Sequence, residues 1–329
     1  MAKIEILGID TGNYATKTEH TSLPSGFLKT KDIPTISGGQ YMKYKGQIYV
    51  PSDTTRVEYI RDKTVDDTHF LLTLLGIGSE LYYRIGKQSK GDLQKAADEI
   101  EEVYVAVGLP PAHHASLASA YKEYFIRHFG ETTEFIYNGI HFSFRVPVVR
   151  VLAQDYTAVM EYNAKSKYAK MENGRFMISQ FYAVDIGGKT VDYVEIRDGK
   201  AVSFDSVNDG ILTMFNTIEK NLRRDGYTAD DILCEKILRR DPIRTEPEVQ
   251  EAVIRQAGEW TDKILRAMNN NINLRSAPVV FIGGGSRLLR PFIKESPLLR
   301  EFEFLGSASA NAVAYGKYMR DLYRSGGLR

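Results

Sequence analysis

The sequence predicts an α/β fold arranged in two domains. Its length of 329 residues exceeds the roughly 100–200 residues of one typical domain. Apolar runs of strand type alternate with segments of helical spacing, which is typical of mixed or parallel sheets covered by helices. An apolar run that ends in Asp-x-Gly occurs as "ILGIDTGNYATK" at 6–17 and again as "YAVDIGGKTVDYVEI" at 182–196. The repeat suggests that each domain carries one such turn.

The composition is that of an ordinary globular chain, with 43% hydrophobic residues, 26% charged residues and a net charge of +1. This charge gives no reason to expect a nucleic-acid or membrane surface. No apolar run reaches the ~18 residues of a membrane helix, and Lys3, Glu5 and Asp10 interrupt the N-terminus, so no signal peptide is expected. The single cysteine, Cys234, excludes an internal disulfide. We therefore expect a cytoplasmic protein.

The first half of the chain begins with two predicted strands, at 3–10 and 15–21. A hairpin is predicted around Gly46, a helix from Phe70 to Ile85, and a polar helix over 92–102. The later elements of this half are a buried strand at 103–109 stopped by Pro110 and Pro111, a helix at 112–129 closed by Gly130, and strands on both sides of Asn138-Gly139.

The second half begins with a predicted helix from Asp155 to Lys165, and the second Asp-Gly hairpin follows. A strand at 201–207 leads through Asn208-Asp209-Gly210 into a mostly helical region at 211–275. Next come a buried strand at 277–282, a triple-glycine turn with Ser286 able to cap the following helix, and a small-residue helix from 307 to 323.

The two Asp-Gly turns combine a carboxylate with backbone that a ligand can approach closely. Gly12 and the pair Gly187-Gly188 can adopt positive φ, and N–H groups aimed into such a turn bind anions. Asp10 and Asp185 would repel a bare phosphate, but a hydrated Mg²⁺ between carboxylate and phosphate removes the conflict. The pair of hairpins therefore predicts a clamp that holds a magnesium-bound polyphosphate from both sides.

The stretch "GGKT" at 187–190 invites interpretation as a Walker A motif. That motif needs a glycine where Ala183 stands, and a helix where the strand-like "VDYVEI" follows. We reject it. The "IGGGS" stretch at 282–286 is a third candidate, because glycines after a buried strand suit a flat ligand lying against the backbone.

Taken in order, these motifs resemble those of the actin-like ATPase superfamily, which includes actin, heat-shock chaperones and sugar kinases. The matching stretches are "GIDTGNYATK", "VRVLAQDYTAVM", "AVDIGGKTVDYV", "VVFIGGGSRL" and "SASANAVAYGKY". The short chain is most similar to the ParM-type plasmid-segregation actins of bacteria and archaea. The resemblance implies two RNase H-like (actin-fold) domains with a nucleotide cleft between them. Domain I would span 1–153 plus 306–329 and domain II would span 154–305, with a helical subdomain at about 211–275.

The resemblance also implies roles for individual residues. Asp10 and Asp185 would organise Mg²⁺ through its waters, and together with Gln154 they form the expected catalytic set. Gln154 would orient the attacking water, with Asp155 as the second candidate. The residues expected to hold the nucleotide are Gly12, Asn13, Lys17, Gly187, Gly188, Lys189, Thr190, Gly210, Gly283, Gly284, Gly285, Ser286 and, for ribose and base, Glu235 and Lys236.

The implied function is a filament-forming ATPase that hydrolyses ATP to ADP and phosphate with Mg²⁺, with GTP as an alternative nucleotide. Its partners would be further copies of itself and an adaptor protein bound to plasmid DNA. Direct contact with DNA is not expected, because phosphate contacts need clustered Lys and Arg, and no membrane contact is expected.

Two other functions stay open. One is a small-molecule kinase, for sugars or acids, of the same superfamily, although the sequence has no clear acceptor motif. The other is a nucleotide-gated scaffold with little hydrolysis, because Gln154 cannot act as a strong base.

Several residues also fit plain structural roles. Lys17 could be a solvated lysine at a strand end, and Asp192 could reach the metal shell or only face the edge of the site. His113 and His114 are expected on the surface at a helix start, since no third ligand lies at metal spacing. Trp260 and Cys234 are expected in the core.

Overall fold

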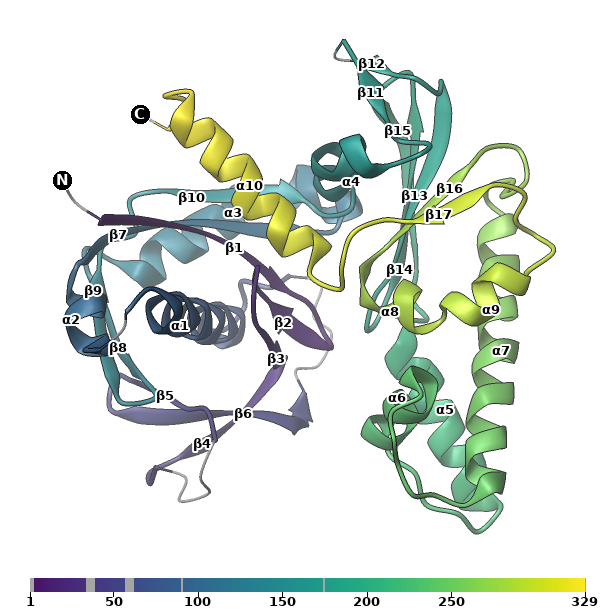
Figure 1. The fold of residues 1–329 in the computed structure, drawn as a ribbon, viewed down its shortest axis with the longest axis horizontal. Coiled ribbons are helices and arrows are strands. Elements are labelled where there is room, and N and C mark those ends of the chain that lie inside the picture. The colour runs from purple at the N-terminus through teal and green to yellow at the C-terminus, as the bar shows by residue number, and fades with distance from the viewer. Residues whose placement is uncertain (1–2, 34–38, 57–61, 90, 174, 329) are drawn as a thin grey trace. The chain divides into compact units, whose positions relative to one another are not determined.

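The computed structural model describes residues 3–33, 39–56, 62–89, 91–173 and 175–328 (Figure 1). The chain divides into two compact units, one formed by Met1–Glu161 with Asn311–Arg329 and the other by Tyr162–Ala310. The sequence analysis drew these boundaries at 153/154 and 305/306. At the first boundary the first unit reaches further, to Glu161, whereas at the second it begins later, at Asn311. The N–H of Asp155 donates to Oδ1 of Asn311 at 3.0 Å, which ties the start of helix α4 (Tyr156–Tyr162) to helix α10 (Ala310–Arg324).

The main sheet of the first unit has the strand order β10-β7-β1-β2-β3. Its strands are β1 (Lys3–Thr11), β2 (Ala15–Lys17), β3 (Ser22–Pro24), β7 (Ile100–Leu109) and β10 (Val149–Ala153). Strands β1, β2 and β3 pair antiparallel, whereas β7 is parallel to both β1 and β10. The sheet therefore joins a meander to two crossover strands.

The sheet of the second unit repeats this plan, with the order β15-β14-β13-β16-β17. Its strands are β13 (Gln180–Ile186), β14 (Val191–Arg197), β15 (Lys200–Val207), β16 (Val279–Ile282) and β17 (Phe302–Phe304). Three antiparallel strands are again followed by two parallel ones. The repeated hairpin thus belongs to a repeated sheet, and the predicted two-part α/β fold is confirmed.

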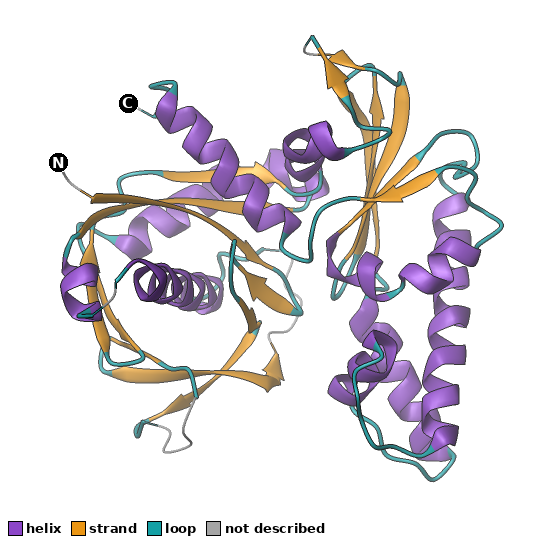
Figure 2. Ribbon diagram, viewed as in Figure 1, coloured by secondary structure: helices purple, strands orange, loops and turns teal. Residues whose placement is uncertain are grey.

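The first unit holds a second, antiparallel sheet of order β4-β6-β5-β8-β9. Its strands are β4 (Gly26–Thr30), β5 (Met42–Tyr44), β6 (Gln47–Arg56), β8 (Thr133–Tyr137) and β9 (Ile140–Phe144). Helix α1 (Thr68–Gln88) lies enclosed between the two sheets (Figure 2) and buries its side chains almost all round from His69 to Leu81. It forms the centre of this unit's core.

The remaining helices complete the two units. They are α2 (Leu93–Asp98) and α3 (Pro111–Phe129) in the first unit, and α5 (Ile211–Arg224), α6 (Asp231–Arg239), α7 (Pro247–Asn269), α8 (Gly283–Leu288) and α9 (Arg290–Glu295) in the second. A 3-10 turn at Asn163–Lys165 and a short hairpin of β11 (Met171–Glu172) and β12 (Arg175–Phe176) complete the second unit. His113 and His114 lie in the first turn of α3 as predicted, but both are half-buried rather than exposed. Trp260 and Cys234 are buried, as predicted. Among the described residues, no helix is long and apolar enough to span a membrane.

The predicted polar helix over 92–102 was wrong at its end. The helix stops at Asp98, and Ile100 already pairs with Lys3 in the parallel ladder. The charged residues around Ile100 favour a helix locally, but the backbone of β7 finds its hydrogen-bond partners in β1. Tertiary pairing therefore outweighed local propensity.

Helix α10 lies directly on strand β1 because glycine leaves room for it. A Cβ at Gly8 would lie 2.0 Å from the carbonyl oxygen of Ala312 and 2.5 Å from the nitrogen of Gly316. On the neighbouring strand, a Cβ at Gly108 would lie 2.0 Å from Oη of Tyr315. These positions fix the distance between the helix and the sheet.

We predict that Gly8→Ala destabilises the fold by about 3 kcal/mol, because the clash is with helix backbone that cannot rotate away. Gly86→Ala is the matched control, since a Cβ at Gly86 in α1 meets nothing within 4 Å. That variant should be stabilised by roughly 0.5–1 kcal/mol, because alanine favours helix. Urea unfolding measures both. Equal unfolding free energies for the two variants would contradict this account of α10.

Candidate functional site

The two Asp-Gly turns close in the same way. In the turn after β1, the N–H of Gly12 donates to the carbonyl of Ala15 at 3.3 Å. In the turn after β13, the N–H of Gly187 donates to the carbonyl of Thr190 at 2.8 Å. Each glycine is therefore bonded to the third residue after it, so the repeated letters correspond to a repeated backbone geometry.

Backbone hydrogen bonds attach the start of helix α5 to the turn at 187–190. Consecutive N–H groups at the start of α5 donate to carbonyls of the turn: Gly210 to Lys189 at 2.9 Å, Ile211 to Gly187 at 3.0 Å and Leu212 to Gly188 at 2.9 Å. A Cβ at Gly210 would lie 2.5 Å from the carbonyl oxygen of Gly188, so only glycine permits this contact. The helix thereby fixes the direction of the turn's carbonyl groups.

The N–H groups of the same turn remain available. Those of Gly188, Lys189 and Thr190 have no acceptor within the part of the chain that the structure describes. Successive N–H groups without acceptors form a concavity that binds anions. The turn at 187–190 is therefore a candidate phosphate site, as the sequence predicts for these residues.

The turn after β1 brings a second set of predicted residues together. Nε2 of Gln154 donates to Oδ1 of Asp10 at 3.1 Å, and Asp10 is only 7% exposed. Lys17 is the register partner of Asp10 in the β1–β2 ladder, so both side chains leave the same face of the sheet. The N–H of Asn13 has no acceptor among the described residues. An acid, a base and an amide thus surround this turn.

Asp185 and Asp192 are register partners in the β13–β14 ladder. Side chains directly opposite each other lie close on one face, and two carboxylates there repel each other. Oδ2 of Asp192 accepts a hydrogen bond from Oγ1 of Thr190 at 2.8 Å. Carboxylate pairs of this kind suit a hard divalent cation, which makes this face the best candidate for Mg²⁺.

The glycines at 283–285 pack against the end of β13. Gly283 has φ of 83°, and a Cβ there would lie 2.0 Å from Oδ1 of Asp185. A Cβ at Gly285 would lie 2.2 Å from the carbonyl oxygen of Ile186. The predicted adenosine loop, Gly283 to Gly285, therefore contacts the predicted metal residue directly.

One prediction at this loop was wrong. Ser286 does not cap the helix, because α8 already begins at Gly283 and makes no side-chain cap hydrogen bond. The Ser286 side chain is fully buried, and its Oγ has no hydrogen-bond partner among the described residues. Of the three glycines, Gly283 alone has the positive φ that turns the chain, so Gly284 and Gly285 already lie within helix α8.

Asp155, the second candidate for catalysis, is 1% exposed and adopts φ of 59°. Asp is among the residues that tolerate this conformation, which here starts α4. Burial beside α10 favours a structural role for this carboxylate over contact with substrate.

Glu235 and Lys236 lie on α6, which packs against α8. Glu235 accepts hydrogen bonds from the guanidinium of Arg239 one turn later, and Lys236 is exposed. The structure therefore brings their helix to the glycine loop.

The sequence analysis missed the supports of the two turns. Asp209 holds α7 through Nε1 of Trp260 at 3.2 Å and Nζ of Lys263 at 2.7 Å, which anchors the start of α5. Nζ of Lys63 donates to the carbonyl of Thr11 at 3.0 Å. The Asn-Asp-Gly run before α5 could have suggested the first support, whereas Lys63 stands in no recognisable motif.

Two other features are poorer candidates. Glu19, His20 and Glu80 offer metal-ligand atoms within 4.8 Å of one another. The guanidinium of Arg84, however, already forms ion pairs with Glu80 at 2.7 Å and with Glu19 at 3.1 Å, so it neutralises these carboxylates in place of a metal ion.

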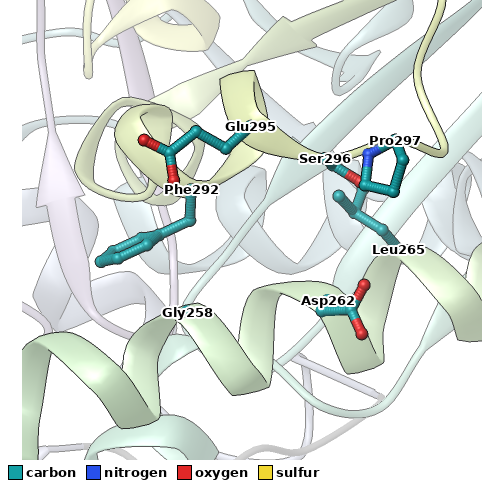
Figure 3. Close-up of a pocket in the computed structure, with 7 residues that line it drawn as sticks. All are labelled: Gly258, Asp262, Leu265, Phe292, Glu295, Ser296 and Pro297. Atoms are coloured by element: carbon teal, nitrogen blue, oxygen red, sulfur yellow. The ribbon is translucent and has the colours of Figure 1, made fainter.

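A cavity of about 190 Å³ between α7 and α9 (Figure 3) is smaller than the ~300–1,000 Å³ of ligand sites and contains no predicted site residue. It is lined by Gly258, Asp262, Leu265, Phe292, Glu295, Ser296 and Pro297.

Comparison with known proteins identifies the fold. No family model and no curated protein sequence matches the chain. Solved structures match over nearly full length: the actin-like protein Alp7A at 12% identity and TM-score 0.69, covering 99% of this chain and 100% of that one. ParM of Bacillus thuringiensis with ATP matches at 14% identity and TM-score 0.65, covering 98% and 100%. An AlfA filament bound to AMPPNP matches at 17% identity and TM-score 0.57, covering 99% of both chains. The chain therefore has an actin-like fold of the ParM type.

We predict that Gly283→Ala destabilises the fold more than Gly226→Ala does. Both glycines have positive φ, of 83° and 87°, so both variants carry backbone strain of about 1–3 kcal/mol. Only Gly283 faces a side chain, since a Cβ at Gly226 meets nothing within 4 Å. Displacing Asp185 should add about 1–3 kcal/mol, measurable by urea unfolding. If Gly283→Ala loses no more unfolding free energy than Gly226→Ala, the Asp185 side chain moves aside at no cost and the prediction is wrong.

We also predict that stability falls with pH below about 6.5 because of His69. Burial, and secondly the charge of Lys63, lower the pKa of His69 from 6.5 to about 2. The unfolded chain binds this proton below pH 6.5 and the folded chain does not, so the unfolding free energy falls by up to ~1.4 kcal/mol per pH unit. His69→Asn should flatten the slope measured between pH 7 and 5. The exposed His141, also replaced by Asn, is the control, and an unchanged slope in His69→Asn would refute the assignment.

Proposed function

We propose that this chain is a filament-forming ATPase that binds Mg·ATP with residues of both units, polymerises, and hydrolyses the bound nucleotide slowly. The observation that carries the proposal is the duplicated turn on an actin-like fold, which presents, beside a carboxylate, N–H groups that have no acceptor among the described residues. Solved proteins of this fold include one with ATP and a filament bound to AMPPNP. The wider task that we propose is the movement of plasmid DNA through an adaptor protein.

In this proposal the turns hold the phosphates. The N–H groups of Gly188, Lys189 and Thr190 donate to phosphate oxygens, and Lys17 adds a positive charge at the other turn. Asp10 and Asp185 hold Mg²⁺ through its waters, since Mg²⁺ keeps most of its hydration shell in such sites. The glycines at 283–285 lie against the adenosine, with Ser286 behind them and Glu235 and Lys236 on the neighbouring helix. ATP is the proposed nucleotide, with GTP as the alternative.

Gln154 has the geometry of a residue that positions water. Its Nε2 donates to Asp10, and its backbone N–H donates to the carbonyl of Leu109 at 2.9 Å, so its orientation is fixed. Its Oε1 makes no hydrogen bond among the described residues and can accept one from the attacking water. An amide oxygen orients water without removing its proton, which supports slow hydrolysis.

An adaptor protein would explain how a near-neutral chain can move DNA. With a net charge of +1, the protein lacks the excess of Lys and Arg that phosphate-backbone binding requires. An adaptor that binds both filament and DNA supplies that contact instead.

The test measures light scattering and phosphate release in one sample after adding Mg·ATP. The wild type should scatter light above a critical concentration and then release phosphate. Asp185→Asn keeps the side-chain volume but removes the charge that holds the metal, so phosphate release should fall at least ~100-fold. Asp198→Asn is the matched control, because Asp198 is exposed at the opposite end of β14 in a turn with φ of 49°.

Phosphate release by Asp185→Asn at the wild-type rate would refute the assignment of Asp185 to the metal. Phosphate release without any concentration-dependent scattering would exclude the filament and leave an ATPase that does not polymerise.

A further inference from the structure

We propose that Asn311 is a positioning residue, which holds Gln154 in the orientation that places the attacking water. This inference rests on the proposed function, because that function assigns the water to Gln154. Asn311 lies in the first turn of α10, far from Gln154 in sequence, and no motif connects the two residues.

The backbone of Gln154 is held on both sides. On one side its own N–H donates to the carbonyl of Leu109, at the end of β7, at 2.9 Å. On the other side the N–H of the next residue, Asp155, donates to Oδ1 of Asn311 at 3.0 Å. Because a residue has only two soft backbone dihedrals, fixing the peptide groups before and after Gln154 also fixes the direction of its side chain.

The contact with Asn311 supports a strained turn. Asp155 adopts φ of 59°, a left-handed conformation that costs free energy for any residue with a Cβ. The chain uses this residue to pass from β10 into α4. The left-handed conformation and the loss of one hydrogen bond each shift a local equilibrium by about 10-fold. The bond to Asn311 therefore offsets the strain, and without it the turn would populate other conformations.

Asn311 is anchored firmly enough to give this support. Asn311 is only 4% exposed and Asp155 only 1%, so water does not compete for the hydrogen bond between them. Helix α10 also packs directly on β1, since a Cβ at Gly8 would lie 2.0 Å from the carbonyl oxygen of Ala312. The acceptor on Asn311 is thus fixed relative to β1, the strand that carries Asp10.

The Gln154 side chain is where this support acts. Nε2 of Gln154 donates to Oδ1 of Asp10 at 3.1 Å. The amide oxygen and nitrogen share one carbon, so the bond made by Nε2 also decides where Oε1 points. If the turn at Asp155 relaxes, this contact is lost and Oε1 no longer occupies one position. A misplacement of ~1 Å in a positioning group can cost about 100-fold in rate, whereas nucleotide binding does not depend on Oε1.

The experiment separates hydrolysis from binding in Asn311→Ala, which removes the acceptor. The rate of phosphate release from Mg·ATP in a single turnover should fall at least ~10-fold. Affinity for a slowly hydrolysed Mg·ATP analogue, measured by calorimetry, should change less than about 3-fold. Lys317→Met is the matched control, because the ion pair of Lys317 with Glu161 joins the same two helices at the far end of α4. It should release phosphate at the wild-type rate.

A double-mutant cycle tests whether Asn311 acts through Gln154. In a Gln154→Ala background, adding Asn311→Ala should lower phosphate release by less than about 2-fold, because the group that Asn311 positions is already absent. If Asn311 only supports the fold, the second substitution costs the same factor in both backgrounds, and the inference is wrong.

The side-chain amide signals of Gln154 in an NMR spectrum give a readout that needs no nucleotide. They are assigned by their absence in Gln154→Ala. In Asn311→Ala they should move toward the position of an exposed glutamine such as Gln250. Unchanged signals would overturn the inference.

The outcomes separate this inference from the proposed function. If the wild type releases phosphate and Asn311→Ala does so equally fast, only the inference is wrong. If the wild type releases none, the proposed function fails, and the water assigned to Gln154 fails with it. Should Asn311→Ala not fold, Asn311→Ser, which keeps a polar side chain too short to reach the Asp155 N–H, is measured against the same criteria.

Discussion

Three backbone hydrogen bonds from the start of α5 to the turn at 187–190 are the constraint on which the candidate site depends. They occupy the carbonyl groups of residues 187–189, whereas the N–H groups of residues 188–190 have no acceptor in the described part of the chain and can meet a ligand. A free glycine-rich turn would sample many orientations and pay an entropic cost to bind. Docked on a helix that Asp209 ties to Trp260 and Lys263, the turn is organised before any anion arrives.

Local signals were enough to predict the elements that form this arrangement. Apolar runs, Asp-x-Gly and Asn-Gly turns and the glycine after 129 each act over a few residues, and they gave most strands and helices. The duplicated turn was also visible, because Asp10 and Asp185 stand at the same place in equivalent hairpins. The resemblance then gave the order in which the pieces combine, which periodicity alone does not encode.

Contacts between distant parts of the chain could not be predicted in this way. The helix over 92–102 ended early because β1, far away in sequence, offered Ile100 a partner. Ser286 lost its capping role because Gly283 turns the chain earlier and packs on Asp185. Lys63 reaches Thr11 across 52 positions, and no motif surrounds it. In each case the deciding partner lies outside the window in which propensity operates.

The two half-sites share a backbone but differ in charge, and that difference assigns them different tasks. The register places a base, Lys17, opposite Asp10, yet an acid, Asp192, opposite Asp185. The first hairpin thus carries one acid and one base at the same register position. The second hairpin places two carboxylates opposite each other, and in the proposed function this face would hold Mg²⁺ through its waters. Under the proposed function, a nucleotide that carries its own Mg²⁺ would suit both hairpins at once, whereas neither a bare phosphate nor a free metal ion would.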